Sequence, residues 1–188
     1  MKRIVLTKRD NEIIEFLKEY KCATSSSIAN LFFNGSIRPC NRRLQYLREN
    51  NLIKSSQEHI SLEKVHYLNK LPKQLKHTTI VSNFISKLYC EDIEILKVKL
   101  EYKIGNIRSD ILVICKIKGK LKIFSVEVCN TKGLDLNKYI RLKESGIYKD
   151  ILPVFPTIIS ISNKDYNSKY LDIINLNLNL DDFIKIKD

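Results

Sequence analysis

The stretch at residues 35–50, GSIRPCNRRLQYLREN, constrains the fold of this chain more than any other part of the sequence. Ser36 can cap the unpaired amides at the start of a helix, and Pro39 falls in the first turn, where a missing N–H costs little. Leu44 and Leu47 lie three residues apart and form the inward face. The stretch therefore predicts an amphipathic helix whose first turns are rich in Arg and Asn.

The solvent side of this helix carries groups that can recognise DNA. Arginine forks can bond guanine, and Asn or Gln amides can pair with adenine, provided that the helix lies in a major groove. An ordinary surface helix with a solvated basic face would show the same pattern. The residues of this stretch that we expect to contact DNA are Ser36, Arg38, Asn41, Arg42, Arg43 and Gln45, with Arg48 on the same solvent side.

The preceding segment favours the first of these two interpretations. Thr7 has capping-box spacing to Asp10 and predicts a helix that runs to about Tyr20. A second cap at Thr24 begins a shorter helix, which the Asn-Gly turn at residues 34–35 ends. A turn this short places the next helix across the previous one, as in a helix-turn-helix.

A hairpin is predicted after the third helix. Residues 52–53 would be its first strand, residues 54–58 a polar tip and residues 65–68 the returning strand. Such a hairpin is the wing of a winged helix-turn-helix, although a solvated loop is the alternative for each polar residue. The residues that could touch phosphates or a minor groove are Lys54, Ser55, Ser56, Lys64 and His66.

The second half of the chain predicts a separate α/β domain. Residues 1–71 would form the first domain, a linker containing Pro72 would follow, and residues 77–188 would form the second. The expected elements are a helix at 77–89, strands at 94–103, 110–115 and 121–129, a helix at 135–149, a strand at 154–162 and a short strand or edge in the last twenty residues.

Charge is distributed unevenly between these halves. The net charge is +12. Because Lys, Ile and Asn are abundant, as an AT-rich coding bias would produce, the total charge alone does not indicate a nucleic-acid partner. Residues 1–76 carry 15 Lys and Arg against 7 Asp and Glu, whereas residues 77–188 carry 18 against 14. This asymmetry favours a first domain that faces nucleic acid.

Cysteines and apolar runs exclude other classes. The odd number of cysteines, without CxxC spacing, predicts buried thiols in place of a zinc site or a disulfide framework. They are Cys22, Cys40, Cys90, Cys115 and Cys129. The sequence has neither an apolar run that could span a bilayer nor a signal-peptide pattern, so we expect a cytoplasmic protein without a membrane partner.

Ordered segments along nearly the whole chain resemble a known family. The run LTKRDNEIIEFLKEYKCATSSSIANLFF precedes RRLQYLRENNLI and a hairpin ending in YLN; then come His77, RSDILV, FSVEVCNTK, the pair Lys138-Tyr139 and FPTIISIS. With these segments the chain resembles the replication-relaxation family of plasmid and mobile-element proteins. The resemblance implies an α+β or α/β chain, in which a DNA-binding winged helix precedes a small domain similar to the PD-(D/E)xK nuclease fold.

The resemblance also implies positions for a nuclease site. Asp110 and Glu127 match the two carboxylates that would bind Mg²⁺, although either could instead be an outward residue of a strand. Cys129 stands at the position where the nuclease fold has a lysine that assists the attacking water. A thiol cannot replace the ammonium group of that lysine. Hydrolysis would require Lys132 or Lys138 to reach in.

A further departure weakens the nuclease interpretation. Asn83 stands on the helix where such nucleases often have an acidic residue. We therefore expect an inactive nuclease-like scaffold with no cofactor, and Mg²⁺ only if the site is active.

Three functions remain open. The first is a DNA-binding protein of a plasmid or mobile element that acts in replication, transfer or its transcriptional control. It would bind double-stranded DNA as a homodimer, with plasmid replication or transfer proteins as further candidate partners. The second is a Mg²⁺-dependent DNA endonuclease that uses Asp110 and Glu127 with Lys132 or Lys138. The third is a protein-interaction module built on the winged helix.

Overall fold

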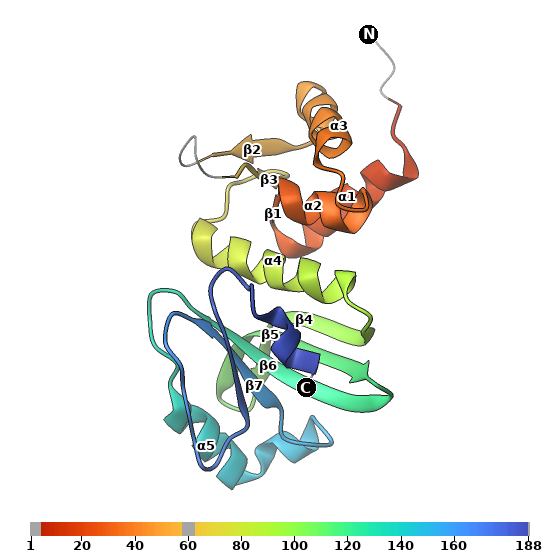
Figure 1. The fold of residues 1–188 in the computed structure, drawn as a ribbon. Coiled ribbons are helices and arrows are strands. Elements are labelled where there is room, and N and C mark those ends of the chain that lie inside the picture. The colour runs from red at the N-terminus through yellow and green to blue at the C-terminus, as the bar shows by residue number, and fades with distance from the viewer. Residues whose placement is uncertain (1–4, 58–62, 188) are drawn as a thin grey trace. The chain divides into compact units, whose positions relative to one another are not determined.

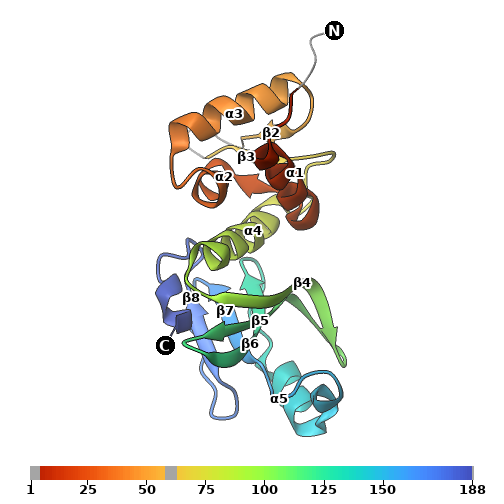
Figure 2. The ribbon, with the colours of Figure 1, turned by 90° about the vertical axis from the view of Figure 1, so that its right-hand side faces the viewer.

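The chain is a mixed α+β protein in a computed structural model that describes residues 5–57 and 63–187. Within these residues it forms five α-helices and two β-sheets. They belong to two compact units, Met1–Glu91 and Asp92–Asp188. Figures 1 and 2 show the elements of each unit from two directions.

The first three helices begin at the predicted caps. They are α1 (Lys8–Tyr20), α2 (Ser25–Phe32) and α3 (Ile37–Glu49). Before α1, Thr7 Oγ1 accepts a hydrogen bond from Asp10 N at 3.3 Å while Asp10 Oδ2 accepts one from Thr7 N at 2.6 Å, which completes the capping box. The turn between α2 and α3 contains Asn34 and Gly35 with φ of 50° and 77°. Positive φ favours Asn and Gly, so these residues suit the turn.

A small antiparallel sheet completes the hairpin. Its strands are β1 (Ala23–Thr24), β2 (Lys54–Ser56) and β3 (Val65–Tyr67), in the order β1-β3-β2. The predicted strand at 52–53 is wrong, because the ladder begins at Lys54 and the apolar side chain of Ile53 is buried. Strand pairing therefore includes part of the predicted tip, and Glu58 at its end lies outside the described residues.

Helix α4 (Leu75–Cys90) packs within the first unit, although its sequence position suggests the start of the second domain. It contacts α1, α2 and β1. The side-chain oxygen of Asn83 accepts hydrogen bonds from Thr24 Oγ1 at 3.3 Å and Ser27 Oγ at 2.8 Å. Asn83 thus stabilises the start of α2, a role distinct from that of an acidic residue at a nuclease site.

The second unit contains a five-stranded mixed sheet. Its strands are β4 (Glu94–Ile104), β5 (Ile107–Ile117), β6 (Lys120–Cys129), β7 (Thr157–Ser162) and β8 (Ile173–Leu176), in the order β4-β5-β6-β7-β8. The first three strands pair antiparallel, and β6, β7 and β8 pair parallel. Lys118 and Gly119 both have positive φ in the tight turn between β5 and β6, as a type I′ hairpin requires.

Helix α5 (Leu136–Ser145) lies in the crossover between the parallel strands β6 and β7. Its buried residues Tyr139 and Leu142 belong to a core with Leu112 and Ile158 of the sheet. The helix was predicted to reach residue 149, but it ends before Gly146, which adopts the left-handed conformation. Short 3₁₀ helices follow at Ile147–Asp150 and Phe183–Lys187.

Candidate nucleic-acid interface and carboxylate cluster

Helix α3 has a buried side and a polar, exposed side. Cys40, Leu44 and Leu47 are buried, so the inward face is the one predicted from helical spacing. The exposed side carries two cationic and two amide side chains: Arg38, Asn41, Arg42 and Gln45. This face can offer guanidinium forks and amides to a polar ligand.

Several residues of the predicted contact stretch have partners within the protein: Gln45, for example, donates from Nε2 to Glu49 Oε1 at 2.8 Å. Arg48 donates from Nη1 to Ser55 Oγ at 3.0 Å and so ties α3 to β2. Ser36 occupies the N-cap position, but its side chain makes no capping hydrogen bond. The expectation that its hydroxyl caps the helix is therefore wrong; its backbone N–H instead donates to Phe33 O at 2.9 Å.

Arg43 is held by a buried carboxylate. Its Nε donates to Asp10 Oδ1 at 2.7 Å and its Nη2 pairs with Asp10 Oδ2, while the same nitrogen donates to Val5 O at 3.1 Å. The Asp10 side chain is 0% exposed and that of Arg43 is 26% exposed. Burial opposes ionisation of Asp10, but hydrogen bonds from Arg43 and Thr7 outweigh it and lower the carboxyl pKa. Arg43 thus joins α1 to α3, a role that spacing along α3 alone did not reveal.

The hairpin supplies fewer candidate contacts than the sequence predicted. Lys64 is exposed, and Lys54 is exposed but donates from Nζ to Asn69 O at 3.1 Å. His66 is only 1% exposed, and its Nε2 lies 3.0 Å from Ser25 Oγ. Burial, followed by the charges of Arg48 and Lys64, lowers the pKa of His66 to about 4. His66 is therefore a neutral core residue, and the expectation that it touches phosphates is wrong.

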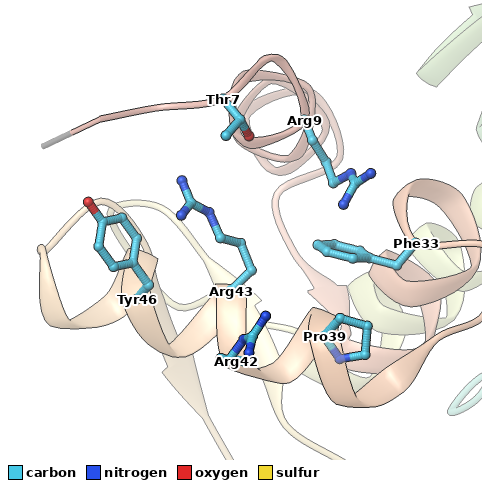
Figure 3. A pocket seen from close by; sticks show the side chains of 7 residues that line it. All are labelled: Thr7, Arg9, Phe33, Pro39, Arg42, Arg43 and Tyr46. Atoms are coloured by element: carbon cyan, nitrogen blue, oxygen red, sulfur yellow. The ribbon is translucent and has the colours of Figure 1, made fainter.

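Open pockets flank α3 on both sides. One, of about 540 Å³, lies between α3 and the hairpin and is lined by Asn41, Gln45 and Lys64 among others. It also contains Glu63, whose carboxylate accepts hydrogen bonds from the backbone and hydroxyl of Ser26 at the start of α2. The other, of about 420 Å³, lies towards α1 (Figure 3). Arg42 lines both pockets.

In the second unit, the two predicted carboxylates lie on neighbouring strands. Ile111 pairs with Val126, so the next position of the antiparallel register sets Asp110 opposite Glu127. Asp110 Oδ2 accepts a hydrogen bond from Val128 N at 2.8 Å, which fixes its side chain against β6. The strands therefore bring Asp110 and Glu127 together.

Glu127 is bound by two side chains of α5. Its Oε1 accepts hydrogen bonds from Lys138 Nζ at 2.8 Å and from the Tyr139 hydroxyl at 2.5 Å. Burial raises the pKa of Glu127, and these two hydrogen bonds offset the rise only in part. Glu127 also raises the pKa of Tyr139, although burial is the larger cause. The sequence resemblance includes Tyr139 only as part of the pair Lys138-Tyr139, and its contact with Glu127 has no signal in the sequence.

The structure distinguishes between the two lysines considered for this cluster. Lys132 is exposed in the loop before α5, whereas Lys138, in the first turn of the helix, reaches Glu127. Cys129 is half-buried, and burial raises the pKa of its thiol. Across residues 5–57 and 63–187, no three His, Cys, Asp or Glu side chains group closely enough to hold a metal ion. Two carboxylates and one ammonium thus make up the charged part of the cluster.

The cysteines are all free, as predicted. Cys22, Cys40 and Cys115 are buried, and burial raises the pKa of each thiol. Cys90 is exposed at the end of α4, so the expectation of burial does not hold for it. In the described part of the chain, no helix is both long and apolar enough to cross a membrane.

The chain matches no protein-family model, and comparisons with curated proteins and with solved structures give no match either.

Proposed function

We propose that the first unit is a winged helix-turn-helix that binds double-stranded DNA, with α3 as the recognition helix. The observation that carries this proposal is the exposed face of α3, where Arg38, Asn41, Arg42 and Gln45 stand between two open pockets. The order of three helices followed by an antiparallel hairpin supports it. Each bidentate contact between such a side chain and a base is worth about 1–3 kcal/mol of discrimination.

The wider role follows from the sequence resemblance. We place the protein in the replication, transfer or transcriptional control of a plasmid or mobile element. It would bind its site as a homodimer, and the second unit would act as an inactive nuclease-like scaffold that docks the second copy or a replication or transfer protein. The mixed sheet with its crossover helix and its paired carboxylates supports this assignment of the second unit.

A binding selection on a random duplex library, with the full chain at physiological salt, tests the main proposal. An enriched motif is the expected result, and a palindromic motif would support a symmetric dimer. Recovery of no motif would contradict sequence-specific binding. If duplex DNA also fails to bind at low salt, the protein-interaction module becomes the better explanation.

A specific observation favours the Mg²⁺-dependent endonuclease as the second candidate. Lys138 reaches the carboxylate of Glu127, so an ammonium is present beside the two carboxylates despite Cys129. Asp110 and Glu127 would hold the cation, and Mg²⁺ would supply charge neutralisation at the phosphoryl group. Lys138 would then orient the attacking water in place of the missing lysine.

Nicking of supercoiled DNA, with and without Mg²⁺, tests this alternative. An active site would lose nicking in Asp110→Ala, Glu127→Ala and Lys138→Met, whereas Lys132→Met should nick normally because Lys132 is exposed in the preceding loop. DNA binding without any nicking would support the scaffold interpretation instead.

A further inference from the structure

The pocket on the α1 side of α3 is lined mainly by cationic and aromatic side chains. It has a volume of about 420 Å³ and is open to solvent. Figure 3 shows the guanidinium of Arg9 beside the ring of Phe33, and Arg43 between Tyr46 and α1. The residues that line it are Thr7, Arg9, Phe33, Pro39, Arg42, Arg43 and Tyr46.

Within the described part of the chain, two of its three arginines have no acidic partner. Arg43 is neutralised by Asp10 and stacks on Tyr46 at 4.4 Å from the ring centroid. Arg9 lies over Phe33 at 4.5 Å, and Arg42 is exposed on α3. Among the described residues, no carboxylate forms an ion pair with Arg9 or Arg42. The pocket therefore has a net positive charge from two helices.

The chemistry and shape of the pocket favour a phosphate group. Guanidinium forks match phosphate oxygens in geometry and bind them as charge-assisted hydrogen bonds. Contact with Phe33 restricts the Arg9 side chain, so less conformational entropy is lost when the guanidinium binds. Because the pocket is open, it suits a phosphate that remains attached to a polymer outside it.

We propose that Arg9 and Arg42 bind a backbone phosphate of the DNA duplex in this pocket, beside the groove that α3 enters. This inference rests on the proposed function, because Arg42 connects the pocket to the exposed face of α3. It adds α1 to the DNA-contacting surface through Arg9, a residue outside the predicted recognition stretch.

Affinity for the selected duplex, measured across a salt series with the full-length protein, tests the proposal. Arg9→Gln should weaken binding roughly three- to tenfold for every sequence tested and reduce the slope of log K against log salt by about 0.9, because one phosphate contact is lost. Lys8→Gln is the matched control: it makes the same charge change on the same helix, where Lys8 is exposed and does not line the pocket. It should leave the slope unchanged.

The thermal midpoint without DNA shows whether Arg9→Gln is folded, since loss of the contact with Phe33 alone should be a small effect. Normal DNA binding by the wild type with an unchanged slope in Arg9→Gln would overturn this inference and leave the proposed function standing. Equal slope losses in Arg9→Gln and Lys8→Gln would show a general charge effect and would also overturn it.

Inorganic phosphate, compared with chloride at equal ionic strength, separates a backbone phosphate from a free anion. If the wild type binds no DNA and phosphate raises its melting temperature only when Arg9 is present, the pocket binds free anions, and the backbone assignment is overturned together with the proposed function. If the wild type neither binds DNA nor gains thermal stability from phosphate, the proposal that this pocket binds anions is overturned.

Discussion

The buried carboxylate of Asp10 depends on the guanidinium of Arg43. We expect Arg43→Gln to reduce the free energy of unfolding by about 3 kcal/mol, because it leaves a fully buried charge without its partner. Urea denaturation followed by circular dichroism measures this change. Asp10→Asn combined with Arg43→Gln should recover part of the loss, since the double variant buries no unpaired charge.

Arg42→Gln provides the matched control for this prediction. Arg42 is the neighbour of Arg43 on α3, but it is exposed and belongs to no ion pair among the described residues. Its substitution should change stability by less than about 0.5 kcal/mol while weakening DNA binding. A stable Arg43→Gln variant with weakened binding would instead restore Arg43 to the DNA-contacting set.

His66 gives the first unit a defined response to acid. Its pKa in the folded state is about 4, below the ordinary value of 6.5, so between these values the unfolded chain binds a proton that the folded chain does not. Stability should therefore be unaffected by His66 above about pH 6.5, fall as the pH drops towards 4, and lose about 3 kcal/mol in total. Urea midpoints from pH 7.5 to 4 measure this loss.

His66→Gln is the control for the acid response. It removes the titrating ring but keeps a polar side chain near Ser25, so its midpoint should vary less with pH over the same range. An equally steep decline in the variant would show that carboxylates, and not His66, determine acid stability.

At the scale of elements, helix caps make unequal contributions. Thr24 Oγ1 accepts from Ser27 N at 3.2 Å at the start of α2, whereas the Ser36 side chain makes no such bond at the start of α3. Thr24→Ala should cost about 1–2 kcal/mol and Ser36→Ala less than about 0.5 kcal/mol. Thermal melts of both variants test this difference, and a similar cost for the two would show that Ser36 caps α3 in solution.

Elements with strong local signals could be predicted from the sequence. The first three helices were predicted from the caps at Thr7 and Thr24 and from the spacing of Leu44 and Leu47. Strands β5, β6 and β7 were predicted from their runs of β-branched residues. Contacts between elements that are far apart in the sequence had no such local signal. The pattern of α4 identifies a buried face but not the unit that covers it, and the two-residue strand β1 exists only through its pairing with β3.

The same limit applies to the candidate sites. Exposure of Arg38, Asn41, Arg42 and Gln45 follows from helical spacing, so the sequence predicted this face. The capture of Arg43 by Asp10 depends on how α1 crosses α3, and the contact of Lys138 with Glu127 depends on how α5 packs on the sheet. The end of α5, in contrast, has a local signal in Gly146.

At the scale of the whole molecule, the two halves of the chain differ in charge: residues 1–76 carry 15 Lys and Arg against 7 Asp and Glu, and residues 77–188 carry 18 against 14. Both units contain ion pairs, such as Lys18 with Glu15 at 3.3 Å in the first and Lys116 with Glu94 at 2.8 Å in the second. In the described part of the first unit, Arg38 and Lys64 are exposed and form no ion pair. The attraction for DNA should therefore come mainly from the first unit.

Two double variants with equal charge changes test this difference. Arg38→Gln with Lys64→Gln should reduce the salt slope of DNA binding by about 2, because each lost phosphate contact contributes about 0.9. Lys120→Gln with Lys149→Gln removes the same charge from exposed positions of the second unit and should leave the slope unchanged. Fluorescence anisotropy with the selected duplex at several salt concentrations measures both slopes. Equal reductions would place phosphate contacts on the second unit as well, and would favour an endonuclease that holds its substrate beside Asp110 and Glu127.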